Sequence, residues 1–360
     1  MRDRSRGAGR AVFLVAVMLL SVVAMGVGFA GSAAANHGSN VIVVDDDFTT
    51  TNATHKTSIQ AALDSAPKDA TIEVRSGEYN ESISFSSDDN GTTLTSVDGP
   101  GAATINASSL AVKLRNDHIR NVTIDGFEIK TEDSSSSIVA TGSGQVSNLT
   151  LVNNTIVSGS GSSANNSAFL ITVSHNLSLI NNSVTTSSSG DGINIGVSGD
   201  PTVTNAVIKS NEFNVGDEAL KIQGVMDVTI TDNNFSGYGD AAAEFADTGN
   251  VTGDIDIQNN QFRGGSAGIL IYNESTGDAS TTAEKATFTI SSNDFDDNTR
   301  HVRDDTDGID TANVLSNNEF DGATVITSSG TIQSTIYGTV QDAINTAGDG
   351  DTISVAPGTY

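Results

Sequence analysis

A short phrase recurs through most of the chain and sets the period of its fold. It reads NVTIDGFEI at Asn121–Ile129 and NLTLVNNTI at Asn148–Ile156. Later copies close at Val184, Phe213, Phe235, Phe262, Phe295 and Phe320. The intervals between closing residues are 27, 28, 29, 22, 27, 33 and 25 residues. A repeat of this length predicts a solenoid, in which each unit buries its apolar face by stacking on the next.

The pattern inside the phrase predicts β-strands. Apolar residues lie seven and five places before the closing one, as Leu149 and Leu151 do before Ile156. This alternation turns one face of a strand inward. A second apolar strand follows in several copies, at Ile193–Ile195, Leu220–Ile222, Ala243–Phe245 and Ile269–Ile271. The fold class predicted is all-β, a parallel β-helix.

Asparagine recurs two places before the closing residue. Asn tolerates left-handed backbone geometry and hydrogen-bonds its neighbours, so it suits a tight corner between strands. Stacked about 4.8 Å apart, such residues form an amide ladder. The predicted ladder consists of Asn154, Asn182, Asn211, Asn233, Asn260, Asn293 and Asn318. A second column lies eight places before the closing residue, at Asn121, Asn148, Asn176, Asn205, Asp227 and Asp254.

With these features the sequence is similar to the right-handed, pectin-lyase-like β-helix family over roughly residues 40–325. The resemblance implies the fold, but it says little of function because this fold carries many unrelated activities. Residues 36–80 are predicted to form an N-terminal cap and first coil, and residues 81–325 the repeats. The run Thr57–Gln60 resembles a capping box at the start of a short helix that covers the open end of the solenoid.

The end of the chain repeats this opening. Val340–Tyr360 aligns without gaps to Ile59–Tyr79, with 8 of 21 residues identical. Residues 326–360 are therefore predicted to be a linker and the start of a second, truncated β-helix cap. We expect a fragment of a longer tandem protein, or a gene truncated at Tyr360. Since this second cap has no coils to cover, we expect it to be poorly packed.

The N-terminus has the pattern of a secretory signal. Four arginines precede an apolar run, Ala11–Ala30, and small residues precede Asn36. Residues 1–35 are predicted to be a signal peptide. The segment resembles the signal of haloarchaeal surface (S-layer-type) glycoproteins. A generic secretory signal or a retained anchor is the alternative. No later segment is apolar enough to span a bilayer.

Composition excludes several classes of function. The formal net charge is −27, which argues against nucleic-acid binding because that needs a cationic surface. Such acidity is typical of proteins kept soluble in high salt, where screening weakens self-repulsion. There is no cysteine, and the five histidines are scattered, so no Cys or His metal site is predicted.

The chain is dense in N-x-S/T sequons, the acceptor sites of N-glycosylation. Thirteen occur, and several of them fall in the asparagine columns, where structural amide bonding competes with modification. Those in loop-like stretches are the better acceptors: Asn52, Asn80, Asn90, Asn165 and Asn273. A glycosylated exterior is predicted.

The family resemblance also implies candidate catalytic residues. Enzymes of this fold are mostly polysaccharide lyases and galacturonan hydrolases, and the hydrolases hold acid and base aspartates on successive coils. The segments Gly190–Gly196 and Gly216–Ile222 are similar to those aspartate motifs, and Gly239–Phe245 follows one coil later. Lys221 and Glu244 share an outward column with Asn194. The full set of candidate catalytic residues is Asp191, Asp217, Glu218, Lys221 and Glu244.

The sequence departs from the family pattern where substrate is held. No His occurs between His175 and His301, and no Arg between Arg120 and Arg263. The alternative is a solvated acidic edge in which Lys221 and Glu244 form a surface ion pair. The basic run Arg300–Arg303 is interpreted as a charged surface loop.

We therefore expect a secreted, glycosylated protein with a structural or adhesive role at a haloarchaeal cell surface. Its expected partners are other envelope proteins or glycans, with no nucleic acid and no membrane span in the mature chain. The alternative is an extracellular polysaccharide lyase or glycoside hydrolase acting on acidic polysaccharide. No cofactor is predicted beyond loosely bound Ca²⁺, and no metal site.

Overall fold

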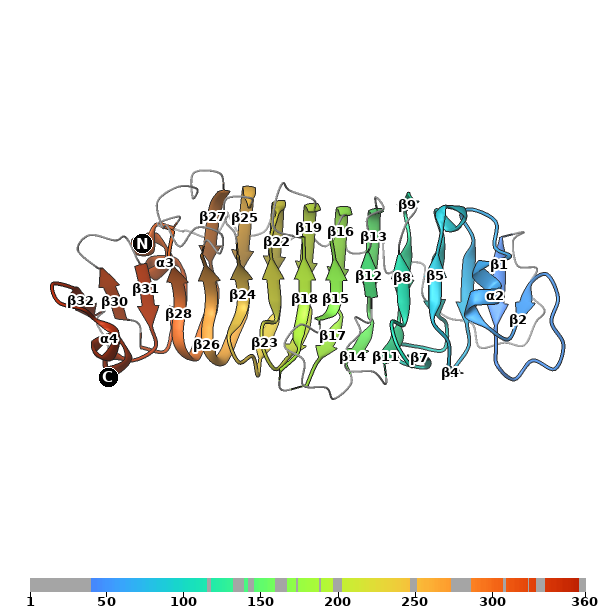
Figure 1. The fold of residues 1–360 in the computed structure, drawn as a ribbon, viewed down its shortest axis with the longest axis horizontal. Helices are drawn as coiled ribbons and strands as arrows, with labels where there is room; N and C mark the ends of the chain where they lie inside the picture. Colours follow the sequence, from blue (N-terminus) through green and yellow to red (C-terminus); the bar gives the residue numbers. More distant parts are fainter. Residues whose placement is uncertain are drawn as a thin grey trace, which may run out of the picture. The chain divides into compact units, whose positions relative to one another are not determined.

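The computed structural model describes residues 40–114, 118–131, 139–141, 146–158, 167–172, 174–187, 189–196, 203–246, 251–272, 286–306, 309–322, 324–327 and 334–355. They belong to one compact unit, Asn40–Tyr360, and form the predicted all-β parallel solenoid with a few short helices (Figure 1). The predicted signal peptide and the sequons at Asn165 and Asn273 lie outside the described residues. Within the described part, no helix is both long and apolar enough to cross a membrane.

One long sheet, sheet A, takes one strand from each coil, and neighbouring strands pair in parallel and nearly in sequence order. The strands of sheet A are β1 (Val41–Val44), β2 (His55–Lys56), β3 (Thr71–Val74), β6 (Thr93–Ser96), β9 (Ile119–Arg120), β10 (Thr123–Asp125), β13 (Val146–Val152), β16 (Ser174–Ile180), β19 (Val203–Lys209), β22 (Val225–Thr231), β25 (Thr252–Gln258) and β27 (Ala286–Ser291).

The second sheet, sheet B, contains two columns of strands. The first column is β4 (Gly77–Tyr79), β7 (Ala103–Ala107), β11 (Phe127–Thr131), β14 (Thr155–Val157), β17 (Ser183–Thr185), β20 (Glu212–Asn214) and β23 (Asn234–Ser236). The second is β5 (Ile83–Phe85), β8 (Val112–Leu114), β12 (Val139–Thr141), β15 (Ser167–Ile171), β18 (Asp191–Ile195), β21 (Leu220–Ile222) and β24 (Ala241–Phe245). Two longer strands run through both columns, β26 (Gln261–Ile271) and β28 (Asp294–Asp304).

The core lies between the sheets and follows the predicted alternation. Leu149 and Leu151 are fully buried and pair with Leu177 and Leu179 of the next coil. The closing phenylalanines stack face to face, with ring centroids 4.9 Å apart for Phe213 and Phe235 and similar spacings in the coils beyond. Like residues therefore meet like residues at the strand spacing, so each coil buries the apolar face of its neighbour.

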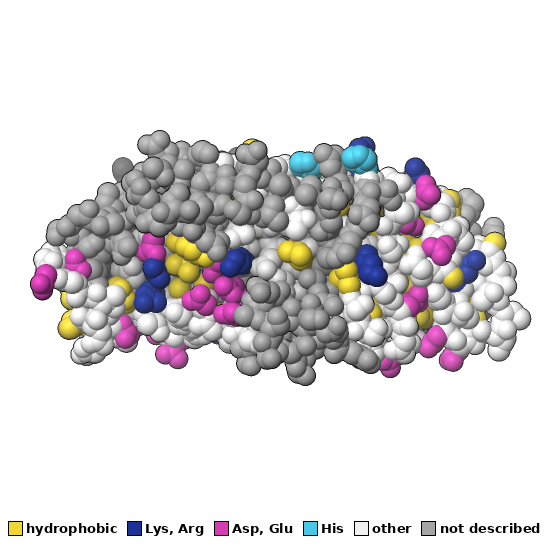
Figure 2. Space-filling model, in the orientation of Figure 1, with side chains coloured by type: hydrophobic (Ala, Val, Ile, Leu, Met, Phe, Trp, Pro, Cys, Tyr) yellow, Lys and Arg dark blue, Asp and Glu magenta, His cyan; other side chains and the backbone are white. Residues whose placement is uncertain are grey.

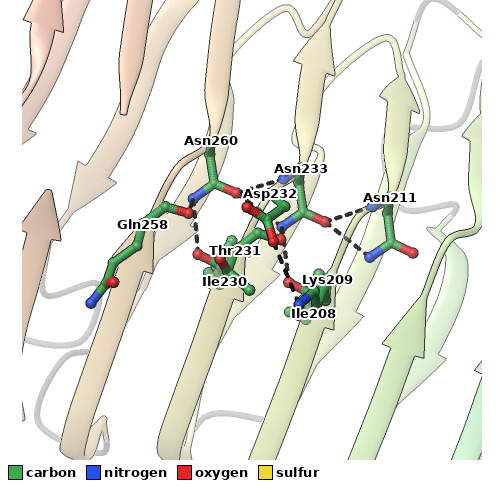
Figure 3. Close-up of polar contacts among 9 residues, drawn as sticks. All are labelled: Ile208, Lys209, Asn211, Ile230, Thr231, Asp232, Asn233, Gln258 and Asn260. Atoms are coloured by element: carbon green, nitrogen blue, oxygen red, sulfur yellow. Dashed lines mark hydrogen bonds and ion pairs between the residues drawn. The ribbon is translucent and has the colours of Figure 1, made fainter. Parts of the chain in front are cut away.

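The inner asparagines form a buried amide ladder beside this core. Asn233 donates from Nδ2 to Asn260 Oδ1 at 3.0 Å, and Asn211 donates to Asn233 Oδ1 at 3.0 Å (Figure 3). The same bond joins each of the remaining neighbours from Asn154 to Asn318. These side chains also bond the backbone, as Asn233 Nδ2 does with the carbonyl oxygen of Ile208. Buried polar groups satisfied in this way fix the register of successive coils.

Contrary to the prediction from the sequence, the left-handed residue of the corner is not the ladder asparagine. It is the preceding residue, for example Asn153 (φ 57°) or Asp232 (φ 59°). The outer column is itself left-handed, as at Asn148 and Asn176, and these exposed amides form a second ladder, with Asn176 Nδ2 donating to Asn148 Oδ1 at 2.8 Å. Asn thus serves two separate purposes, backbone conformation and side-chain bonding.

The N-terminal cap contains helix α2 (Ile59–Leu63), whose Ile59 and Leu63 are buried. The N-cap is Ser58, one residue after Thr57, with which the predicted capping box begins, and its hydroxyl accepts from the backbone nitrogen of Ala61. The predicted capping box does not form, because the third helical residue is Ala61, which has no acceptor side chain. The backbone nitrogens of Ile59 (2.7 Å) and Gln60 (3.0 Å) donate to Glu81 instead. A short 3₁₀ helix, η1 (Ser87–Asp89), follows in the next coil.

The last described elements pair in a different way. Helix α3 (Thr311–Asn317) and strand β29 (Glu319–Phe320) follow β28, and antiparallel strands come after them. Strand β31 (Ser334–Tyr337) pairs antiparallel with β28, so the parallel order ends there. Beyond it lie β30 (Thr324–Thr327), α4 (Val340–Thr346) and β32 (Thr352–Val355).

Candidate active site

The candidate residues gather where β18, β21 and β24 meet in sheet B. Asn194 pairs with Lys221, and Lys221 pairs with Glu244, so the outward column expected from the sequence is present. Their inward neighbours Ile222 and Phe245 are fully buried in the core. The preceding turns bring further carboxylates to the same edge.

Glycines allow these turns to stack closely. A Cβ on Gly192 would lie 2.5 Å from the carbonyl oxygen of Ala219, next to Glu218. A Cβ on Gly239 would lie 2.6 Å from the carbonyl oxygen of Gly216. Both contacts are too close for any other residue without a shift. Gly192, directly after Asp191, and Gly239, directly before Asp240, therefore let acidic turns of successive coils approach.

Glu244 is held in a buried ion pair. Its Oε1 lies 3.1 Å from Lys221 Nζ and accepts a hydrogen bond from the Tyr272 hydroxyl at 3.1 Å. Lys221 Nζ also lies 3.8 Å from Glu218 Oε1. The interpretation of Lys221 and Glu244 as a surface pair is wrong, since the Glu244 side chain is only 2% exposed. The side chains of Lys221 and Tyr272 contact this outward-facing carboxyl.

A second group lies on the other side of Glu218. Single carboxylate oxygens of Asp191, Asp217 and Glu218 lie within 4.8 Å of one another. Asp191 is 5% exposed and accepts one bond, from Asn194 Nδ2 to its Oδ2 at 3.2 Å. Its other oxygen, Oδ1, is buried and has no hydrogen-bond partner among the described residues.

Burial and crowding raise the pKa of several of these carboxyls. The pKa of Asp191 rises to about 7, chiefly because burial disfavours the charged form, and next because Glu218 lies beside it. The pKa of Glu244 also rises to about 7 through burial, although Lys221 opposes the rise. Burial raises the pKa of Asp217 in the same direction. Shifted carboxyls gathered at one edge are typical of functional sites.

Two members of the site were not among the candidates predicted from sequence. Asp240, in the turn before β24, is exposed and lies within 4.8 Å of Glu218 and Glu244, oxygen to oxygen. Tyr272 comes directly after the apolar run of β26, and its hydroxyl donates to Glu244. Nothing in the sequence around Tyr272 indicates this contact. On the face shown in Figure 2, acidic side chains gather in one patch between basic and apolar ones.

The basic run near the C-terminal end does not form a surface loop. Arg300–Arg303 lies within β28, and His301 is fully buried there. Arg303 Nε donates to Asp305 Oδ1 at 3.0 Å. The interpretation was wrong because the run belongs to a strand, in which His301 is buried and its ring contacts Phe295 and Phe320.

The described sequons differ in what their amides do. Asn52 and Asn80 are exposed. Asn52 uses Oδ1 to accept from Thr54 and His55, and Asn90 uses Oδ1 to accept from the backbone nitrogen of Arg120. In the outer column and at the left-handed corner positions, by contrast, Nδ2 is the donor, as in Asn148 and Asn176 and in Asn153 and Asn181. N-glycosylation joins the glycan to Nδ2.

Among the residues that the structure describes, three groups of carboxylates have the spacing to hold a metal ion. One is the exposed loop Asp45–Asp47, the second is Asp191, Asp217 and Glu218, and the third is Glu218, Asp240 and Glu244. In the third group Lys221 already neutralises Glu244. Oxygen-only donor sets of this kind suit hard cations such as Ca²⁺.

Comparisons with known proteins give matches among solved structures only. No protein-family profile matches the sequence, and no curated protein sequence matches it. Among solved structures, it is similar to a pectin methylesterase from carrot, with a TM-score of 0.44, 11% identity, and coverage of 78% of this chain and 87% of that one. A pectin methylesterase from Aspergillus niger gives a TM-score of 0.41 at 13% identity, covering 77% and 88%. The A-module of an Azotobacter vinelandii mannuronan C-5 epimerase gives 0.30 at 14% identity, covering 68% and 90%.

The parallel pairing of successive coils identifies the class of fold, an all-β parallel β-solenoid. Identities this low say nothing of activity. What the site does must be argued from its own residues.

Proposed function

We propose that the chain is an extracellular enzyme that hydrolyses glycosidic bonds of a polysaccharide. The observation that carries this proposal is Glu244, a buried carboxyl held by Lys221 and Tyr272 beside the exposed carboxylate of Asp240. Glycoside hydrolysis needs one carboxylic acid of the enzyme to protonate the leaving-group oxygen, and one carboxylate of the enzyme to act as nucleophile or general base beside the sugar ring.

Roles follow from exposure and contacts. Glu244 is the general acid, because burial favours its protonated form and its position is fixed by two partners. Asp240 is the nucleophile, since it is exposed and free to reach a bound sugar. Lys221 and Tyr272 are positioning residues. The carboxylate oxygens lie within 4.8 Å, which is nearer the roughly 5 Å spacing of retaining enzymes than the wider inverting spacing.

The test is the release of reducing ends from a panel of neutral and acidic polysaccharides. We expect Glu244→Gln to lower the rate by about 100-fold or more. Glu212→Gln is the matched control, because Glu212 is an exposed glutamate of β20 in the same sheet, and it should leave the rate unchanged. Equal rates for the wild type and Glu244→Gln would remove Glu244 from the mechanism.

A second candidate function is a structural or adhesive role at a haloarchaeal cell surface. It is favoured by the exposed sequons Asn52 and Asn80, whose Nδ2 atoms donate to no described residue. Intact mass and peptide mapping of the protein from its own cells test it. Glycans on these residues would support a surface glycoprotein, and an unmodified chain free in the medium would contradict it.

A further inference from the structure

The outer asparagine column of sheet A contains the same acceptor sequence in three successive coils. The three N-x-S/T sequons begin at Asn121, Asn148 and Asn176. All three asparagines are exposed, and all three are left-handed, with φ between 53° and 56°. A glycosyl transferase therefore meets one sequon in one backbone conformation three times over. A difference in modification between them must come from what each side-chain amide binds.

The amide nitrogens of these asparagines differ in their contacts. Asn148 Nδ2 donates to Asn121 Oδ1 at 2.6 Å, and Asn176 Nδ2 donates to Asn148 Oδ1 at 2.8 Å. Asn205 extends the ladder, with its Nδ2 donating to Asn176 Oδ1 at 3.0 Å. Each bond runs from a later coil to an earlier one, so the first asparagine accepts only. Asn121 Nδ2 donates to no residue that the structure describes.

The ladder begins at Asn121 because the preceding coil has a glycine in this column. Gly91 comes two residues before Thr93, as Asn121 comes two residues before Thr123, and Thr93 pairs with Thr123. Gly91 is left-handed as well, with φ 83°, so it keeps the backbone conformation of the column. It has no side chain that could accept a hydrogen bond. The glycine therefore leaves the exposed nitrogen of Asn121 available.

We propose that Asn121 is an N-glycosylation site and that Asn148 and Asn176 are not. In the transfer, Nδ2 forms a bond to the anomeric carbon of a lipid-linked sugar phosphate and loses a proton. The bond from that carbon to the phosphate oxygen breaks, and the phosphate keeps the electron pair. Amide resonance holds the nitrogen lone pair, so the amide must twist before Nδ2 can react.

This twist has a different cost at the three positions. At Asn148 and Asn176 it breaks the hydrogen bond that Nδ2 donates to the preceding coil. At Asn121 it breaks none, and the ladder stays intact because Asn121 contributes only its oxygen. The site lies directly after β9 in sheet A (Figure 1). It is separate from the proposed hydrolysis, which uses Glu244 and the turn before β24 in sheet B.

The experiment is peptide mapping, by mass spectrometry, of the full chain secreted from a haloarchaeal host that N-glycosylates its own surface proteins. The lipid-linked oligosaccharide of that host is the probe. We expect glycan on Asn121. The occupancy of Asn148 and Asn176 should be lower by about fivefold or more, because each must lose one hydrogen bond. An unmodified Asn121, or equal occupancy of Asn121 and Asn148, would overturn the proposal.

Two variants at the start of the ladder separate the free nitrogen from the position in the column. Asn121→Gly removes the acceptor of Asn148 Nδ2, so glycan should appear on Asn148. Asn121→Asp removes the same sequon but keeps an acceptor, so Asn148 should stay unmodified. Gly91 and Asp227 show that both residue types adopt the left-handed conformation in this column, and thermal unfolding should show that both variants fold. Equal occupancy of Asn148 in the two variants would overturn the proposal.

Discussion

The two copies of the cap sequence have different surroundings in the same molecule. In the first copy Leu63 is 3% exposed and Val74 is fully buried. Their counterparts in the second copy, Ile344 and Val355, are 51% and 47% exposed. Both copies nevertheless form a short helix followed by a strand, α2 with β3 and α4 with β32.

The difference lies in what stacks against each copy. Strand β3 pairs in parallel with β1 and with β6, so a complete coil covers its apolar face. Strand β32 pairs antiparallel with β30, and no described coil lies beyond it. The cap sequence therefore determines helix and strand locally, while burial comes from the coil that follows. Poor packing was expected of this region, and it applies to Ile344 and Val355, whereas Tyr337 and Ala343 are buried.

The largest expected effect comes from truncating the matched apolar residues. Leu63→Ala should lower the free energy of unfolding by about 3 kcal/mol, because it leaves a cavity in a closed core. Ile344→Ala should change it by less than about 0.5 kcal/mol. Urea unfolding of the two variants measures the contrast. Similar losses in both would show that the second copy is covered in solution.

The next effect is an acid sensitivity confined to the C-terminal end. His301 is buried under the junction with β31, and burial lowers its pKa from 6.5 to about 4, although Asp321 Oδ1 lies 3.2 Å from Nε2. The unfolded chain takes up a proton near pH 6.5 and the folded chain does not. The stability from neutral His301 is therefore complete above pH 6.5 and is lost as pH falls towards 4.

Between pH 7 and pH 4.5 the free energy of unfolding of the wild type should fall by on the order of 2 kcal/mol more than that of His301→Gln, because the variant has no imidazole to protonate. The measurement is urea unfolding of both proteins at pH 7 and pH 4.5. The same pH dependence in both would contradict a buried neutral His301.

A smaller effect is expected at the helix caps. Glu81 reaches α2 from the next coil and accepts from two backbone nitrogens, so Glu81→Gln should cost about 1–2 kcal/mol. In the second copy the side chain of Asp342 bonds only Thr339 of its own turn in the described contacts. Asp342→Asn should therefore lower the free energy of unfolding by only about 0.5 kcal/mol. Equal costs would mean that the caps are independent of the coil.

The smallest expected effect is a gain in stability when a coil is added after the second copy. A copy of Asn80–Gly126 joined after Tyr360 would supply the coil that the first cap has. We expect it to bury Ile344 and Val355 and to raise stability by about 1 kcal/mol after the entropy of ordering the new coil. Hydrogen exchange over α4 and β32 reports the change. Unaltered exchange there would show that the second copy cannot seat a coil.

Much of the fold was predictable because its signals are periodic. The spacing of Leu149, Leu151 and Ile156 predicts the inward strand face, and the recurrence of Asn predicts the inner ladder. The left-handed position was misplaced by one residue, since the sequence does not show whether an Asn is used for its backbone or for its side chain.

The sequence predicted several residues of the site, but not how deeply their side chains are buried. Acidic residues after glycine in successive coils indicated Asp191, Asp217 and Glu218. The burial of Glu244 and its contacts with Lys221 and Tyr272 depend on residues of neighbouring coils. Neither property has a local sequence pattern.

The central claim is hydrolysis at Glu244 and Asp240, and the anomeric configuration of the first product tests it most directly. Proton NMR of a polysaccharide digest should show a saturated sugar with the configuration of the bond cleaved, and no product with Glu244→Gln. An inverted product, or an unsaturated sugar from elimination, would contradict this account of the site.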